Sequence, residues 1–243
     1  MRPRTYGGSC WQAAARQADE MTAFELRKTP LHSSHIARGA RMAPFAGWEM
    51  PVQFRGIAAE HEAVRGAVGA FDVSHMGQIR IANGEAISLL EHLLPAEPGR
   101  LETGQMLYSV LCNELGGIID DLTVYRIDTD EFMLVVNASR TADDLRWMEE
   151  AADRFDDVDI ESLGDERAIL AVQGPAAETL LSGLIGDCVE QLEYYSFLQS
   201  HGAFGPLLAS RNGYSGEDGY EIICSRDHAS ALWDAVLAAG AEP

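Results

Sequence analysis

The sequence contains very little lysine: Lys28 is the only one, and arginine supplies the rest of the basic residues. The 18 basic residues are outnumbered by 38 acidic ones, which gives a formal net charge of −20. A surface this negative repels nucleic-acid phosphates and anionic lipid headgroups. The charge balance therefore argues against a protein that binds nucleic acid or a membrane surface.

Cysteines are few, and long apolar runs are missing. The four cysteines are scattered without a C-x-x-C pair, which indicates a reducing compartment and no zinc site. No apolar run approaches the ~18 residues of a membrane-spanning helix, and the N-terminus lacks an apolar signal core. The sequence also lacks a P-loop and a dinucleotide-binding fingerprint. We therefore expect a soluble cytoplasmic protein without a metal site.

The acidic, lysine-poor composition resembles that of salt-adapted cytoplasmic proteins. In molar salt the Debye length falls to about 3 Å, which screens the self-repulsion of such a surface. GC-rich coding would also replace lysine with arginine, so the composition leaves both explanations open. A halophilic protein would gain stability as the KCl concentration rises.

The first 25 residues differ from the rest of the chain, because they combine early arginines and a Gly-Gly pair with no strand pattern. We predict a disordered N-terminal extension over residues 1–25, in which Met21 is a candidate natural start. Structure signals become dense from residue 26 onward. Hydrophobic residues make up 47% of the chain, enough for a real core in one large domain or two small ones.

Helical and strand patterns alternate without the strict order of a doubly wound sheet, which predicts an α+β fold. Residues 31–54 contain the pattern of a short helix followed by a stretch rich in Gly and Pro. The patterns then predict helices over 57–75, 85–95, 141–155, 175–186 and 225–240. A Thr-Ala-Asp-Asp cap pattern begins the helix predicted over 141–155. They predict strands over 77–84, 131–138, 168–174, 194–200, 207–213 and 220–224, and a hairpin over 106–127. No sequence repeat of fixed period is present.

Two adjacent carboxylates, Asp120 and Asp121, lie inside a strand pattern, where aspartate is disfavoured. Neighbouring strand side chains point to opposite faces. One face carries Asp121 with Thr123 and Tyr125, which places a carboxylate, a hydroxyl and a phenol in a row. The other face is aliphatic and should pack on the core, with Asp120 near the turn and within reach of solvent. Asp121 is the stronger candidate for function, although both residues could simply flank the turn.

Three glycines, Gly213, Gly216 and Gly219, surround Tyr214 and precede a strand that carries Glu221. Such a stretch lets the backbone turn sharply and approach a ligand. An ordinary glycine-rich hairpin loop has the same composition, so this pattern alone does not assign a function.

Eight sequence blocks follow one another in a characteristic order. They are KTPLH (28–32), GARMAPFAGWEMP (39–51), GAFDVSHMG (69–77), LYSVLCNELGGIIDDLTVY (107–125), VVNA (135–138), AVQGP (171–175), YYSF (194–197) and GYSGEDGYE (213–221). Over about residues 26–243 the chain closely resembles the aminomethyltransferase family, the T proteins of the glycine cleavage system.

This resemblance implies ferredoxin-like α+β folate-binding domains around a central hole that binds tetrahydrofolate as co-substrate. It also implies a lipoylated carrier (H) protein as partner and a reaction that moves a methylene from the S-aminomethyl-dihydrolipoyl carrier to tetrahydrofolate, with release of ammonia. Family members continue with a Gly-Leu-Gly-Ala-Arg-Asp block and a C-terminal β-rich domain, which this sequence does not reach. We therefore expect a chain shortened at its C-terminus, whose activity alone is open.

The resemblance also implies a set of site residues. The second aspartate of Ile-Ile-Asp-Asp is the family's catalytic carboxylate, which corresponds to Asp121, the residue that the strand faces favour. The folate-binding residues would be Tyr108, Asp121, Thr123, Tyr125, Asn137, Tyr194, Tyr214 and Glu221. A carboxylate such as Glu221 can accept adjacent N–H groups of a pterin, and tyrosines offer flat apolar area with a polar tip. Many family members have valine where this chain has Thr123.

Two alternatives share the folate module. One is the folate-binding part of an enzyme that oxidises dimethylglycine or sarcosine, although such enzymes usually carry a flavin domain and no dinucleotide fingerprint is present here. The other is a non-enzymatic folate-binding protein that assists iron–sulfur cluster assembly, whose distinguishing cysteine motif would lie beyond this C-terminus. The Ile-Ile-Asp-Asp and glycine-rich blocks match the T proteins better than either.

Overall fold

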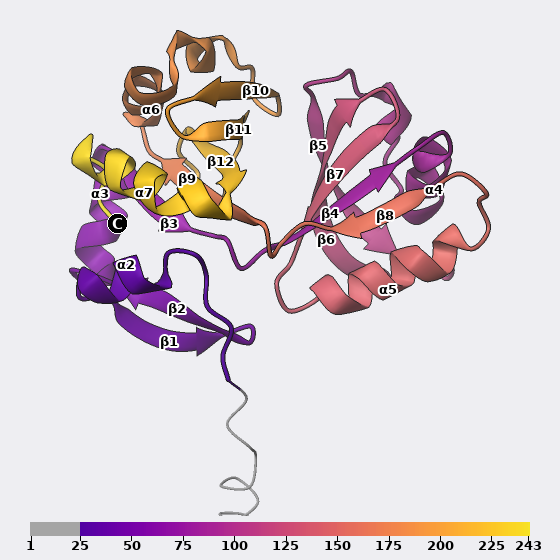
Figure 1. Ribbon diagram of the computed structural model, residues 1–243, viewed down its shortest axis with the longest axis horizontal. Helices are drawn as coiled ribbons and strands as arrows, with labels where there is room; N and C mark the ends of the chain where they lie inside the picture. The colour runs from indigo at the N-terminus through magenta and orange to yellow at the C-terminus, as the bar shows by residue number, and fades with distance from the viewer. Residues whose placement is uncertain (1–24) are drawn as a thin grey trace, which may run out of the picture.

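The computed structural model describes residues 25–243, so almost all of the predicted N-terminal extension lies outside the described residues. Two five-stranded antiparallel sheets and one two-stranded sheet combine with helices in this region, which confirms the α+β class (Figure 1). No helix within residues 25–243 is long and apolar enough to cross a membrane.

The first five-stranded sheet has the order β5-β6-β7-β4-β8. Its strands are β5 (Met106–Cys112), β6 (Ile118–Asp128), β7 (Glu131–Val136), β4 (Gly77–Ala82) and β8 (Asp159–Ser162). Helices α4 (Ala86–Leu93) and α5 (Thr141–Ala152) cover its outer face, where Leu89, Leu90 and Met148 are fully buried (Figure 1). The burial of these helix side chains against strand residues forms one hydrophobic core.

The second five-stranded sheet has the order β10-β11-β12-β9-β3. Its strands are β10 (Phe197–Gly202), β11 (Gly205–Arg211), β12 (Gly219–Ser225), β9 (Arg167–Gln173) and β3 (Gly69–Asp72). Helices α6 (Ala177–Ile185) and α7 (Ala229–Ala238) cover its outer face and bury Leu181 and Trp233. Short 3₁₀ turns lie at η1 (Pro98–Arg100), η2 (Asp187–Gln191) and η3 (Arg226–His228).

The two sheets share one ferredoxin-like arrangement. Strands β8, β4, β7 and β6 take the same relative places in the first sheet as β3, β9, β12 and β11 in the second, and β5 and β10 are the added edge strands. In the second unit the edge position beside β9, which corresponds to that of β8 in the first unit, is filled by β3. This strand comes from much earlier in the chain. The sequence shows no repeat because the shared feature is the backbone connection, which many side-chain combinations allow.

The inner faces of the two sheets pack against each other and form a third core. Tyr125, Met133 and Val135 of the first sheet meet Ile169, Phe197, Leu208 and Ile223 of the second. Helices lie outside and sheets inside (Figure 1). Side chains at one end of this interface can therefore come from both units.

The N-terminal part of the described chain packs beside the second sheet. It contains α2 (His32–Ala37), the hairpin of β1 (Arg41–Phe45) and β2 (Trp48–Gln53), and α3 (Ile57–Gly66). His35 Nε2 lies 2.8 Å from Asp72 Oδ2, which also accepts a 2.6 Å hydrogen bond from Thr29. Burial acts to raise the pKa of Asp72, but the hydrogen bonds from His35, Ser74 and Thr29 hold it below its usual value.

Several predicted elements end elsewhere or were missed. The helix predicted over 57–75 ends at Gly66, and residues 69–72 form β3 instead, because a short apolar run does not distinguish a helix from a strand. The β1–β2 hairpin contains two prolines and β8 is a mostly exposed edge strand, so neither has a clear strand pattern. The predicted cap at Thr141 is wrong, because its hydroxyl donates to the Asn137 carbonyl instead.

Candidate functional site

A hollow of about 180 Å³ lies where the two sheets meet. It is lined by Tyr108 and Thr123 from the first unit and by Tyr195, Asn212, Gly213 and Tyr214 from the second. Three of the residues predicted from sequence therefore face one cavity. A larger cavity of about 310 Å³, lined by Ile127, Arg167 and their neighbours, contains none of the predicted site residues.

Asp121 lies on the inner face of β6, and hydrogen bonds hold both of its carboxylate oxygens. The Tyr108 hydroxyl donates to Oδ2 at 3.0 Å, and the Asn137 side-chain amide donates to Oδ1 at 3.0 Å. The hydrogen bond to Asp121 raises the pKa of Tyr108 above its usual value. Asp121 is thus an oriented carboxylate with a neutral phenol beside it.

Asp120 points to the opposite face, as the strand alternation predicts, but its environment differs from the prediction. It is only 7% exposed and lies on the face that α5 covers, so the expectation that solvent reaches it is wrong. The Asn137 backbone N–H donates to its Oδ2 at 3.0 Å and the Asn137 side chain to its Oδ1 at 2.9 Å. These donors replace the water that burial removes.

Asn137 follows the end of β7 and joins the two aspartates. Its side-chain nitrogen also lies 3.2 Å from the Asp121 carbonyl oxygen. In the register of β6 and β7, Leu122 pairs with Val136. Asn137, the first residue after β7, therefore lies beside Asp121. The loop after a buried strand therefore orients a catalytic candidate on the neighbouring strand.

Glu221 on β12 is the second carboxylate of the site. Asn212 donates to its Oε2 at 2.9 Å, and the Tyr125 hydroxyl donates to the same oxygen at 3.4 Å. Burial raises the pKa of Glu221, although these two hydrogen bonds act in the opposite direction. Burial also raises the pKa of Tyr125, and the nearby charge of Glu221 adds to the effect. Tyr125 is completely buried, so its link to the site is the hydrogen bond that its hydroxyl makes with Glu221.

The structure places the two adjacent tyrosines differently. Tyr195 lines the hollow, whereas Tyr194, the predicted one, is 64% exposed and packs edge-on against Tyr195 with ring centres 4.7 Å apart. Tyr195 has a φ of 63°, a conformation that L-residues rarely adopt outside functional or tightly constrained segments. No sequence signal marks this left-handed residue, and Tyr195 and Asn212 were both missed.

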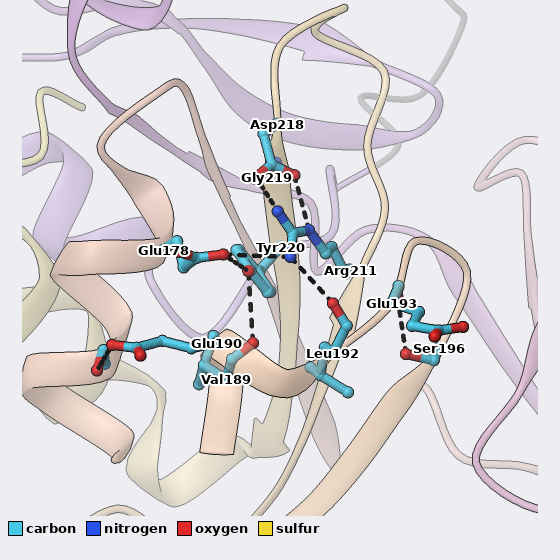
Figure 2. Close-up of polar contacts among 11 residues, drawn as sticks. Glu178, Val189, Glu190, Leu192, Glu193, Ser196, Arg211, Asp218, Gly219 and Tyr220 are labelled. Carbon is cyan, nitrogen blue, oxygen red and sulfur yellow. Dashed lines mark hydrogen bonds and ion pairs between the residues drawn. The ribbon is translucent and has the colours of Figure 1, made fainter. Parts of the chain in front are cut away.

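Arg211 connects the chain just before Tyr194 with the glycine-rich loop around Tyr214 (Figure 2). Its guanidinium donates to the Leu192 carbonyl at 3.0 Å and pairs with Glu178 at 3.1 Å. It also pairs with Asp218, at the end of the loop. Figure 2 shows Arg211 between these partners, with the Tyr220 hydroxyl directed at Glu178. The network fixes the chain just before Tyr194 relative to β12.

Gln173 holds the other side of the glycine-rich loop. Its side-chain amide donates to the carbonyls of Asn212 at 3.0 Å and Tyr220 at 3.3 Å, and it accepts a hydrogen bond from Ser215 at 2.9 Å. A Cβ added at Gly213 or Gly219 would lie 2.0 Å or 2.4 Å from the Gln173 side chain. Glycine is needed at both positions because the glutamine passes directly beneath them.

Seven of the eight predicted residues thus fall into three groups, and Tyr194 lies outside them. Hydrogen bonds connect Tyr108, Asp121 and Asn137, and another connects Tyr125 with Glu221. Thr123 lines the hollow, and Tyr214, which is 78% exposed, stands at its rim. Within residues 25–243 no group of three or more His, Cys, Asp or Glu side chains could hold a metal ion.

Comparisons with known proteins identify similar chains. The model of the GCVT N-terminal domain family matches residues 31–243. The aminomethyltransferases of Thermotoga maritima and Thermotoga petrophila are each 43% identical over 212 residues, which is 87% of this chain and 58% of theirs. The chain therefore spans less than two thirds of the length of these curated relatives.

Solved structures agree with the sequence matches. The crystal structure of the glycine cleavage system aminomethyltransferase T from Bartonella henselae has a TM-score of 0.80 and 36% identity, over 88% of this chain and 57% of that one. The heterotetrameric sarcosine oxidase from Corynebacterium sp. U-96 has a TM-score of 0.60 at 16% identity, over 88% of this chain and 94% of that one. The second match shows a shared fold only.

Proposed function

We propose that this chain, which belongs to the aminomethyltransferase family with the GCVT N-terminal domain, takes part in the transfer of a one-carbon group to tetrahydrofolate. The substrate would be an aminomethyl group on the dihydrolipoyl arm of a carrier protein. The methylene would pass to tetrahydrofolate, and ammonia would leave. The curated relatives bear the name aminomethyltransferase, and the solved relative from Bartonella henselae belongs to a glycine cleavage system.

The observation that carries this proposal is the geometry of Asp121. Its carboxylate stands beside a hollow between two units, with Tyr108 on one oxygen and Asn137 on the other. A carboxylate fixed in this way needs little reorganisation when positive charge develops next to it. In the proposed reaction the carbon that leaves the sulfur becomes iminium-like, and Asp121 would stabilise that charge and orient the attacking amine nitrogen.

The remaining residues fit a reduced pterin. Both donors to Glu221 reach Oε2, and no residue within 25–243 donates a hydrogen bond to Oε1. Glu221 could therefore accept N–H groups of the pterin edge, with Asn212 fixing its orientation. Tyr108, Tyr195 and Tyr214 supply flat side chains around the hollow. The folate-binding set would be Tyr108, Asp121, Thr123, Tyr125, Asn137, Tyr194, Tyr214 and Glu221.

The proposal includes a lipoylated carrier (H) protein as partner and a cytoplasmic location. The methylene arrives on a lipoyl arm, so the carrier must dock where the arm can reach Asp121. No metal is needed for this chemistry, because a fixed carboxylate supplies the charge stabilisation.

The test is a transfer assay with aminomethylated lipoyl carrier and tetrahydrofolate, in which ammonia release is measured. Asp121→Asn keeps the shape of the side chain and removes its charge, so we expect folate binding to persist and turnover to fall by about 10²- to 10³-fold. Asp128→Asn, at the exposed end of the same strand, is the control and should keep full activity. Near-full turnover of Asp121→Asn would overturn the assignment, and oxidation of an N-methyl amine would favour the sarcosine-type alternative.

A further inference from the structure

Asp144 is a buried carboxyl group for which the proposed reaction gives no role. It lies in the first turn of α5 and has no exposed surface. Neither of its oxygens receives a hydrogen bond from any donor within residues 25–243. An ionised carboxylate in such a place would be strongly unfavourable, because nothing replaces its lost hydration.

Asp120 is itself buried, on the face of β6 that packs against α5, and its carboxyl group interacts with that of Asp144. The oxygens of Asp120 already accept hydrogen bonds from the backbone and side chain of Asn137. Two ionised carboxylates in contact would repel each other, whereas one proton shared between them forms a short charge-assisted hydrogen bond. Because Asp120 accepts hydrogen bonds from Asn137 whereas Asp144 accepts none, the negative charge belongs on Asp120 and the proton on Asp144.

The charges around Asp144 agree with this placement. Burial, followed by the hydrogen bond to Asp120 and its negative charge, raises the pKa of Asp144 to about 8. Asp143 in the same turn adds to the increase, and Arg140 just before the helix opposes it. Asp143 itself is occupied by ion pairs with Arg140 and Arg146 on the exposed side of the turn.

The pair continues a line of hydrogen bonds that ends in the hollow. Asp144 contacts Asp120, Asp120 is held by Asn137, and Asn137 also donates to Asp121 Oδ1. Tyr108 completes the line on the far oxygen of Asp121. The orientation of the Asn137 amide is therefore set on one side by the Asp120–Asp144 pair and on the other by the carboxylate that faces the ligand.

We propose that Asp144 is a positioning residue: as a neutral carboxylic acid it donates a hydrogen bond to Asp120, which fixes the Asn137 amide and thereby the orientation of Asp121. Asp144 touches no reacting atom. Its effect on turnover rests on the proposed function, whereas its protonation and its hold on Asn137 are properties of the folded chain alone.

The first experiment examines the folded chain by NMR. We expect a protonated Asp144 carboxyl group at pH 6, and we expect the side-chain amide signals of Asn137 to move in Asp144→Leu but to stay in place in Asp144→Asn, which retains an N–H donor. Asp143→Asn, one residue away on the exposed side, is the matched control. An ionised Asp144 carboxylate at pH 6, or Asn137 signals that do not move in folded Asp144→Leu, would overturn the inference.

The second experiment measures turnover in the transfer assay. Asp144→Leu should lower kcat between about tenfold and about a hundredfold while KM for folate changes little, because a misaligned Asp121 costs the reaction more than it costs binding. Asp144→Asn should restore most of kcat, which a purely space-filling role would not require. Equal kcat in Asp144→Leu and Asp143→Asn would contradict the inference. If the unmodified chain shows no transfer, the proposed function fails and the NMR result alone decides the role of Asp144.

Discussion

Replacing Asn137 by alanine tests the bridge between the two aspartates. The change removes a side chain that donates to Asp120 Oδ1, Asp121 Oδ1 and the Asp121 carbonyl at 2.9, 3.0 and 3.2 Å. The backbone N–H of residue 137 would still donate to Asp120. The cost of the substitution depends on whether water can replace the hydrogen bond that each oxygen loses.

The two carboxylates differ in that respect. Asp120 is 7% exposed, so water would not replace the hydrogen bond that its Oδ1 loses, and removing a hydrogen bond from a buried charged group costs about 1.5–3 kcal/mol. Asp121 is only partly buried, so water would replace most of what it loses. We therefore expect Asn137→Ala to lower the free energy of unfolding by about 3 kcal/mol, most of it from Asp120.

Urea denaturation at pH 7 measures this loss. Asn113→Ala is a matched control, because the Asn113 side chain also makes hydrogen bonds to its surroundings but in an exposed turn, where its Oδ1 accepts from the N–H groups of Leu115 and Gly117. An exposed pair of this kind should contribute about 1 kcal/mol. If Asn137→Ala costs no more than Asn113→Ala, then Asp120 is not held by the bridge as the structure indicates.

Three further predictions follow from the same contacts and charges. The pKa of Asp144 is raised to about 8. Between about pH 4 and pH 8 the folded state therefore binds one more proton than the unfolded state. The free energy of unfolding falls as pH rises through this range. Asp144→Asn should remove a slope of about 1.4 kcal/mol per pH unit, and urea curves at pH 5 and 7 with an unchanged gap between variant and parent would refute this. Gly219→Ala should lose about 1–3 kcal/mol in the same assay, because its Cβ would lie 2.4 Å from Gln173, whereas Gly183→Ala in α6 has open space and should be neutral or stabilising. With a net charge of −20, the melting temperature should rise from low to molar KCl, and a constant value would reject the halophilic interpretation.

The sequence could predict which face of β6 carries Asp121 because the deciding feature is local. Side chains alternate along a strand, so the composition of each face of β6 can be read without knowing its partners. The burial of Asp120 could not be read in this way, since it depends on α5, which begins at Thr141 and covers that face from outside.

Other parts of the site depend on register and backbone conformation. Asn137 reaches both aspartates only because Leu122 pairs with Val136, and strand register is not visible in a single sequence. Tyr195, rather than Tyr194, lines the hollow because its φ of 63° turns the chain, and tyrosine gives no hint of such a conformation. The glycine-rich loop was recognisable, but its partner Gln173 lies on a strand that is distant in sequence.

The most direct test of the central claim is calorimetric titration of the chain with tetrahydrofolate, in parallel with Glu221→Gln and the control Asp128→Asn. The hollow between the two sheets should bind one reduced folate, and Glu221→Gln should weaken binding at least about tenfold because one carboxylate no longer pairs with the pterin N–H groups. Asp128→Asn should bind as the parent does. Absence of binding to the parent chain, or equal affinity of Glu221→Gln and the parent, would contradict the account.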